Sequence, residues 1–146
     1  MVKNAEQLKE KYLHLNEADG PVFKIKNDPR FINGIGKFLA RIGLDELPNI
    51  FNILKGDLSW VGPRPLPVKE AKKIKPQISK KRESVLPGIT SWWIVNGAHS
   101  LNFKQWMKLD QKYIKNLNFL TDLQILLKTF YLIIQIGKNF ILKKVF

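Results

Sequence analysis

Cysteine is absent from this sequence, and histidine occurs only twice, at His14 and His99. Without cysteine the chain forms no disulfide, no thiolate zinc site and no cysteine nucleophile, and two histidines argue against a multi-histidine metal centre. Acidic residues are few as well: Lys and Arg number 25 against 12 Asp and Glu, which gives a formal net charge of +13. An excess of this sign predicts a polyanionic neighbour, which is a nucleic acid, an anionic membrane face or a phosphorylated substrate.

Long apolar runs are also missing. The longest uninterrupted one, Phe130 to Ile134, is far shorter than the roughly 20 apolar residues that a helix needs to cross a bilayer. The N-terminal MVKNAEQLKEKY is charged where a secretory signal peptide is apolar. We therefore expect neither a signal peptide nor a spanning helix in this chain. Apolar residues nevertheless make up 45% of the 146 residues, enough for the core of one domain.

The apolar residues recur mostly at helical spacing, and turn residues separate the helical stretches. Two stretches differ: residues 57–68 are too rich in proline for regular structure of any length, and the β-branched and aromatic residues 87–97 predict a strand or a tight loop. The fold class is therefore mainly α with short extended segments. The predicted helices cover residues 5–15, 35–42, 45–55 with Gly56 as the stop, 101–114 and 119–145.

The last predicted helix carries apolar residues with lysines among them. This pattern fits an amphipathic helix lying in a membrane interface, and it also fits a core helix with a solvated lysine face. Trp92, Trp93 and Trp106 are open to three interpretations. They could sit at the headgroup level of a membrane, pack in the core or stack on a nucleotide.

The stretch LDELPNIFNILKGDLSWVGPRP, residues 44–65, holds the side chains best suited to chemistry. Asp45 and Glu46 are adjacent carboxylates at the start of a predicted helix, where acidic residues also serve as ordinary caps. Arg64 lies between two prolines, and a stiffened main chain lowers the entropic cost of gripping a phosphate with a guanidinium. Asp57 is a further carboxylate that either lies near a metal or caps a turn.

This stretch closely resembles the catalytic segment of the bacterial sugar transferases, the monotopic polyprenyl-phosphate phosphoglycosyl transferases of polysaccharide and glycoconjugate assembly. Three further motifs follow in the family's order: PGITSWWIVNGA at 87–98, LDQKY at 109–113 and FLTDLQILLKT at 119–129. The upstream residues 20–39 are similar as well. The resemblance covers nearly the whole chain, so we expect one sugar transferase domain over residues 1–146, lacking the family's N-terminal membrane hairpin.

The resemblance implies an enzyme that moves a sugar 1-phosphate from a UDP-sugar to a polyprenyl phosphate, such as undecaprenyl phosphate. Asp45 would be the nucleophile that carries the phosphosugar, and Glu46 would assist it and hold Mg²⁺ together with Asp57. The groups that would bind substrate phosphates are Arg64, Arg41 and Asn96. The resemblance also implies a peripheral place on the anionic, cytoplasmic face of the bacterial inner membrane, and a role in making exopolysaccharide, capsule or lipopolysaccharide.

The chain departs from the family pattern at several positions. Ala40 stands where the family has an arginine, and Arg41 is turned by about 100° from that position if both lie on one helix. Ile94 and Ala98 replace a glutamine and an arginine. A degenerate or non-catalytic remnant or subunit of the family therefore stays open. So does a small basic nucleic-acid-binding module, which a steep salt dependence of RNA or DNA affinity would identify.

Overall fold

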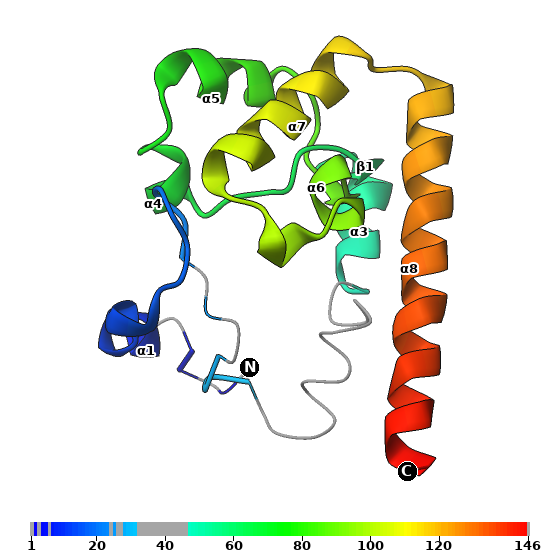
Figure 1. The fold of residues 1–146 in the computed structure, drawn as a ribbon. Helices are drawn as coiled ribbons and strands as arrows, with labels where there is room; N and C mark the ends of the chain where they lie inside the picture. The colour runs from blue at the N-terminus through cyan, green and yellow to red at the C-terminus, as the bar shows by residue number, and fades with distance from the viewer. Residues whose placement is uncertain are drawn as a thin grey trace.

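The structure, a computed structural model, describes residues 2, 4–5, 7–23, 25, 28–31 and 47–145. Across these residues the chain is mainly helical, with two short strands, which confirms the predicted fold class (Figure 1). The elements in chain order are α1 Gln7–Lys11, η1 Leu13–Leu15, α3 Asn49–Lys55, β1 Ser59–Val61, α4 Val68–Ala71, α5 Pro76–Glu83, β2 Gly88–Thr90, α6 Trp92–Val95, η3 Ala98–Ser100, α7 Phe103–Lys115 and α8 Phe119–Val145.

The two strands form a small parallel sheet, with Ser59 opposite Gly88 and Val61 opposite Thr90. A parallel pair needs a crossover connection, and α4 and α5 supply it. Pro76 is the first residue of α5, a position where the missing N–H has no helical partner to lose. The sheet thereby brings the two ends of the segment 59–90 side by side.

Two apolar clusters stabilise this arrangement. The first joins the N-terminal segment to α6 and α7 through the buried residues Val22, Ile74, Trp93, Trp106 and Met107. The second lies where α8 packs against α6 and the sheet, and it is built from Val61, Tyr113 and Ile125. The Tyr113 hydroxyl lies 3.1 Å from the Val61 carbonyl oxygen and 2.9 Å from an Asp122 carboxylate oxygen, so the single O–H of this buried phenol has acceptors on both sides.

The helix expected to begin at Asp45 begins later. Leu47 and Pro48 form a turn, and α3 starts at Asn49. The proline explains the difference, because it disfavours helical backbone in the residue before it. The predicted stop is confirmed: Gly56 caps α3 with a φ of +82°, in the left-handed region that glycine adopts without strain.

The segment 87–97 contains both an extended and a helical part, whereas the sequence predicted a strand or a tight loop. After β2 the chain turns at Ser91 into α6, a single helical turn. The backbone N–H of Ile94 donates to the Ser91 hydroxyl at 3.4 Å, which caps this turn despite its β-branched residues. The capping box of Asn102 and Gln105 likewise starts α7.

The long helix α8 runs along one side of the molecule (Figure 1). Ile125 is fully buried, but many large apolar side chains of this helix are exposed, Phe119 at 77% and Phe130 at 64%. By length and composition Phe119–Lys138 could cross a membrane, and only 6% of its most apolar window is buried. Counting uninterrupted apolar runs overlooked this helix, because a few polar residues interrupt its apolar stretch; length and composition alone do not make it a spanning helix. The remaining exposed apolar residues of α8 are Leu120, Leu123, Leu126, Leu127, Tyr131, Ile133 and Ile134.

Candidate active site

The VGPRP and PGIT motifs meet in the structure. Gly62, the first residue after β1, donates its N–H to the Thr90 carbonyl at 3.0 Å, and Gly88 donates to the Pro63 carbonyl at 3.1 Å. The first bond continues the parallel pairing past the end of β1, and the second joins the start of β2 to the chain beyond β1. The backbone is therefore fixed up to the residue before Arg64, which is the residue that the sequence predicted to bind phosphate.

The Arg64 side chain lies over an aromatic pair. Its guanidinium carbon is 5.3 Å from the centre of the Trp93 ring, close enough for a cation–π interaction. Trp93 stacks on Trp106 with 4.7 Å between ring centres, and Phe103 meets Trp106 edge-on. Trp93 and Trp106 pack in the core, one of the three interpretations left open for them, and both also line the cavity described next.

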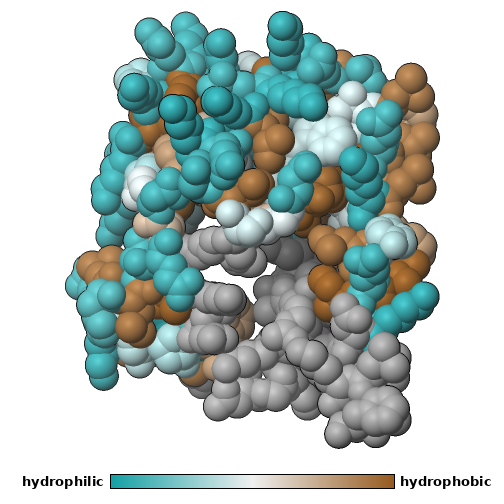
Figure 2. Space-filling view, in the orientation of Figure 1, coloured by the Kyte–Doolittle hydropathy of each residue, from teal (hydrophilic) through white to brown (hydrophobic). Residues whose placement is uncertain are grey.

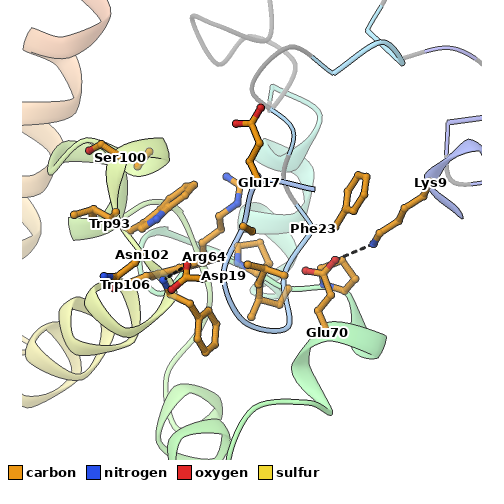
Figure 3. A pocket seen from close by; sticks show the side chains of 18 of the residues that line it. Lys9, Glu17, Asp19, Phe23, Arg64, Glu70, Trp93, Ser100, Asn102 and Trp106 are labelled. Atoms are coloured by element: carbon orange, nitrogen blue, oxygen red, sulfur yellow. Dashed lines mark hydrogen bonds and ion pairs between the residues drawn. The ribbon is translucent and has the colours of Figure 1, made fainter. Parts of the chain in front are cut away.

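A cavity of about 680 Å³ opens in front of Arg64. Figure 3 shows Trp93 and Trp106 on one side of Arg64, and Phe23, Glu70 and Lys9 on the other. Segments far apart in the sequence form the walls: residues 17–23, the proline-rich 64–67 and residues 98–103. A volume of this size is within the range of small-molecule sites in proteins.

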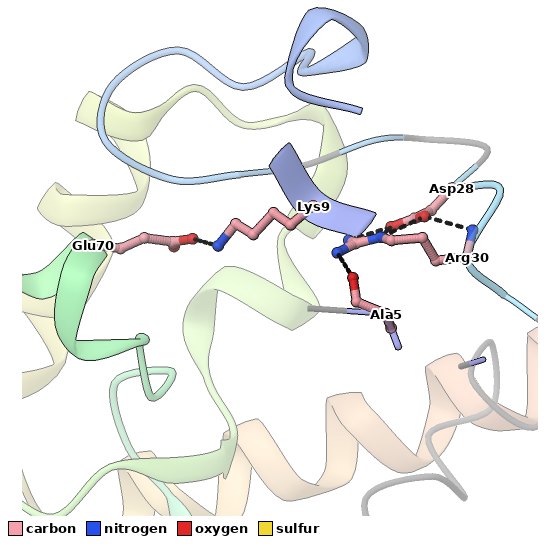
Figure 4. Close-up of polar contacts among 5 residues, drawn as sticks. All are labelled: Ala5, Lys9, Asp28, Arg30 and Glu70. Atoms are coloured by element: carbon pink, nitrogen blue, oxygen red, sulfur yellow. Dashed lines mark hydrogen bonds and ion pairs between the residues drawn. The ribbon is translucent and has the colours of Figure 1, made fainter. Parts of the chain in front are cut away.

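Three charged side chains that line the cavity, Lys9, Glu70 and Arg30, are in ion pairs, and the carboxylates of Glu17 and Asp19 line it as well. Lys9 Nζ lies 2.8 Å from Glu70 Oε1, and Arg30 Nη2 lies 2.6 Å from Asp28 Oδ2 (Figure 4). Arg30 also donates to the Ala5 carbonyl at 3.0 Å. Hydrogen bonds from the Arg30 side chain lower the pKa of Asp28 below its usual value, against the opposing effect of burial. These pairs fix the N-terminal segment against the rest of the wall.

Arg64 is different. Within residues 2–31 and 47–145, as far as the structure describes them, its guanidinium has no carboxylate partner and lies over the Trp93 face. A half-buried arginine at a cavity wall, held over a ring and lacking a counter-ion, is suited to bind an anion that enters the cavity. Arg64, which the sequence predicted to bind phosphate, thus lies where a phosphate that enters the cavity can reach it.

The other predicted site residues are not gathered here. Asp45, Glu46 and Arg41 lie outside the described residues. Asp57 is exposed just after the cap of α3, where its N–H donates to the Asn52 carbonyl at 2.9 Å. Neither Asp57 nor Asn96 lines the cavity. The Asn96 amide donates to the Trp92 carbonyl at 2.7 Å and so ends α6.

The two described departures from the family pattern have different surroundings. Ile94 packs against the first apolar cluster, so its side chain contributes to the core. Ala98 lines the cavity and has a φ of +34°, uncommon for a residue other than glycine. At Ala98 the wall therefore offers a methyl group where the family pattern has a guanidinium.

Sequence reasoning missed Arg82 and the role of Asp110. Arg82 Nη2 donates to the Arg64 carbonyl at 2.5 Å, and Arg82 Nε lies 2.9 Å from Asp110 Oδ2. The Arg82–Asp110 contact is a buried ion pair, in which the N–H does not point at the carboxylate well enough to form a hydrogen bond. Burial raises the pKa of Asp110 to about 7, although Arg82 opposes the shift. Two signals were available: Asp110 lies in the LDQKY motif, and arginine is rare in this lysine-rich sequence.

The sequence pattern of the family described as bacterial sugar transferase matches residues 1–136. The chain belongs to this family. It is 42% identical to the galactosyl transferase CpsE of Streptococcus agalactiae serotype III over 127 residues, which are 86% of this chain and 28% of that protein. It is 36% identical to the undecaprenyl-phosphate galactose phosphotransferase of Salmonella typhimurium over 137 residues, 88% of this chain and 28% of that protein.

A third relative is the UDP-glucose:undecaprenyl-phosphate glucose-1-phosphate transferase of Xanthomonas campestris pv. campestris. The identity is 39% over 111 residues, which are 71% of this chain and 23% of that protein. The chain thus spans less than a third of the length of these three relatives.

Proposed function

We propose that this bacterial sugar transferase moves a sugar 1-phosphate from a UDP-sugar to a polyprenyl phosphate in the assembly of a bacterial polysaccharide. Family membership and the names of the Salmonella and Xanthomonas relatives support a phosphotransfer to a polyprenyl carrier. The observation that carries the proposal is the position of Arg64, a cavity-wall arginine that has no carboxylate partner in the described part of the chain.

The proposed reaction has two steps. A carboxylate oxygen of Asp45 attacks the sugar-bearing phosphorus of the UDP-sugar, a P–O bond to the aspartate forms, and the bond to the departing UMP breaks. An oxygen of the polyprenyl phosphate then attacks the same phosphorus and releases the Asp45 carboxylate. Arg64 would hold a phosphate oxygen in both steps, because a guanidinium matches the geometry and charge of a phosphate.

The start of α3 bears on how Asp45 would be activated. A helix dipole acts within the first turn, and α3 begins at Asn49, four residues beyond Asp45. Asp45 itself lies outside the described residues, so the proposal assigns no role to this helix N-terminus. Positive charge from Arg64 is the contribution that the described residues offer.

We also propose that Glu46 holds Mg²⁺, as the resemblance implies. In the part of the chain that the structure describes, no group of three or more His, Cys, Asp or Glu side chains could hold a metal ion, and Asp57 stands alone and exposed. The described residues therefore do not supply a magnesium site by themselves. When bound, the metal would offset negative charge on the diphosphate. Loss of transfer on chelation, restored by added Mg²⁺, tests this part.

The proposal places the protein on the cytoplasmic face of the inner membrane, with α8 against the lipid. The exposed apolar side chains of this helix would otherwise face water, and Figure 2 shows them as a brown edge beside a largely teal surface. The net charge of +13 favours an anionic lipid surface. Lys128 on α8 lies over the ring of Trp92 at 4.8 Å, and Lys112 lies at 5.8 Å from it, so cations flank the helix where it meets the domain.

The experiment that tests the reaction is adduct detection. The full chain is incubated with a radiolabelled UDP-sugar and Mg²⁺, and its intact mass is measured. We expect a mass increase of one phosphosugar, and none for Asp45→Asn. Labelling of the variant would show that another residue is the nucleophile. Because the family includes transferases named for galactose and for glucose, both sugars are tested.

One observation favours a second function, in which the chain binds a nucleotide sugar but does not catalyse the transfer. Ala98 lines the cavity without the charge that the family pattern has there. Loss of a charge-assisted contact weakens transition-state binding by about 1.5–3 kcal/mol. Binding of UDP-sugar without any adduct or transfer would identify this function.

A further inference from the structure

A closed ring of contacts joins Arg64 to Trp93, Trp106 and Arg82. Arg64 lies over Trp93, Trp93 stacks on Trp106, and the guanidinium carbon of Arg82 lies 5.9 Å from the centre of the Trp106 ring. The hydrogen bond from Arg82 Nη2 to the Arg64 carbonyl, 2.5 Å long, closes the ring. Arg64 thus contacts one tryptophan of the pair and Arg82 contacts the other. Arg82 also forms a hydrogen bond with the main chain of Arg64.

Asp110 is the acidic partner of Arg82 in this arrangement. Its side chain is 2% exposed, that of Arg82 is 10% exposed, and their charged groups are 2.9 Å apart. A buried guanidinium without a counter-ion is strongly unfavourable, so the ionised form of Asp110, which predominates above about pH 7, makes it possible for Arg82 to stay inside the protein. Arg82 comes from α5 and Asp110 from α7. The pair therefore joins two packed helices to the loop of residues 62–67 that carries Arg64, called the Arg64 loop below.

Apart from its flanking prolines and the hydrogen bond from Gly88 to the Pro63 carbonyl, the Arg64 loop has few other restraints. The prolines at 63, 65 and 67 donate no backbone hydrogen bond, and no regular element begins before α4. Among the described residues, Arg82 supplies the hydrogen bond to the Arg64 carbonyl. A cavity-wall guanidinium that is already held in place loses less conformational entropy when it binds a phosphate.

We propose that Arg82 and Asp110 are positioning residues for substrate phosphate binding, acting on Arg64 through its carbonyl and the shared tryptophan pair. This inference rests on the proposed function, in which Arg64 binds a phosphate of the nucleotide sugar. Neither Arg82 nor Asp110 lines the cavity, so neither touches the substrate. Their effect on affinity is therefore indirect, and we assign it to Arg64, which the cycle below tests against a path through the tryptophans alone.

A double-mutant cycle with UDP as the probe tests this dependence. The affinity of the full chain for UDP is measured by calorimetry for wild type, Arg64→Ala, Asp110→Asn and the double variant. We expect Arg64→Ala to weaken binding about 10–100-fold, the usual loss for a charge-assisted contact, and Asp110→Asn about 10-fold. The double variant should bind no more weakly than Arg64→Ala alone, since Asp110 has nothing left to position.

Arg82→Lys is the second variant, in case Asp110→Asn fails to fold. Lysine keeps a positive charge beside Asp110, but its single ammonium lacks the fork that reaches both Asp110 and the Arg64 carbonyl. It should therefore weaken UDP binding while the circular dichroism spectrum stays that of wild type. Asn118→Ala is the matched control: it removes the side chain that accepts the Thr121 N–H at the start of α8, far along the chain from Arg64. This variant should lower the melting temperature and leave UDP affinity unchanged.

The outcomes separate the two proposals. Wild-type protein that binds neither UDP nor a UDP-sugar would overturn the proposed function, and the positioning role with it. Wild-type protein that binds UDP, together with an Asp110→Asn effect of equal size in the presence and absence of Arg64, would overturn the positioning role alone. Unchanged affinity in a folded Arg82→Lys variant would do the same.

Discussion

Gly62 and Gly88 meet backbone to backbone where the two strands of the sheet end and begin. A Cβ atom built on Gly62 would lie 2.8 Å from the Gly88 nitrogen, and one built on Gly88 would lie 2.7 Å from the Gly62 Cα. Real Cβ atoms do not approach other backbone atoms this closely. The two glycines therefore allow the VGPRP and PGIT motifs to lie in contact, which is what brings Arg64 next to Trp93.

Gly88→Ala should lower the free energy of unfolding by about 3 kcal/mol, at the upper end of the effects of overpacking. The clash is with backbone atoms of Gly62, which cannot swing away as a side chain can. Urea unfolding of wild type and variant measures the difference. Gly137→Ala is the matched control, because a Cβ there meets nothing within 4 Å and alanine favours a helix by about 0.5–1 kcal/mol. Equal stability of the Gly88 variant and wild type would contradict the close approach.

Local patterns in the sequence predicted much of the fold. Helical spacing predicted α7 and α8, and Gly56 marked the end of α3 because helix propensity and glycine caps depend on neighbouring residues alone. The start of α3 was missed because the effect of Pro48 on the backbone of Leu47 was overlooked. The helical turn α6 was missed because its tryptophans, isoleucine and valine favour strands, whereas the Ser91 cap favours a helix.

The candidate site was less predictable than the fold. Stiffening of Arg64 by its flanking prolines was visible in the sequence, and the structure places Arg64 at a cavity. The partnership of Arg82 with Asp110 and with the Arg64 carbonyl was not visible, because it depends on how α5 packs against α7. No local sequence pattern predicts which of the many lysines and arginines will be buried beside a carboxylate.

Asp110 should give the stability of this protein a distinctive pH dependence. Burial raises the pKa of Asp110 to about 7 in the folded state, from 3.8 in the unfolded chain. Between these values the folded state binds more protons than the unfolded state, so the free energy of unfolding falls as the pH rises from about 4 to about 7, by at most about 1.4 kcal/mol per pH unit. Urea unfolding across this range, for wild type and Asp110→Asn, measures the slope.

The difference between those two curves isolates Asp110, because the other titrating groups are common to both proteins. Asp28 acts in another window: its pKa is lowered, so its contribution is lost only as the pH falls below about 4. The free energy of unfolding of Asp110→Asn minus that of wild type should therefore be larger at pH 7 than at pH 4. Parallel curves over this range would show that Asp110 is ionised throughout.

Ala98→Arg should strengthen UDP binding about 10-fold or more, by returning a guanidinium to the cavity wall where the family pattern has one. Calorimetry with UDP measures the change. Ala98→Gln is the control, because it adds a side chain at the same unusual φ of +34° without adding charge. Equal affinities for the two variants would show that the charge at this position does not reach the nucleotide.

Leu127→Gln with Phe130→Gln should weaken binding of the full chain to vesicles of anionic phospholipid at least about 10-fold. These side chains are 61% and 64% exposed on α8, so the proposed membrane contact loses two large apolar groups, each worth about 1.5–3 kcal/mol on full burial, while the core loses none. Sedimentation with vesicles measures binding, and an unchanged melting temperature checks the fold. Leu13→Gln, at 55% exposure on the distant η1, should leave binding unaltered. Equal losses from both substitutions would show that no particular face of the protein meets the lipid.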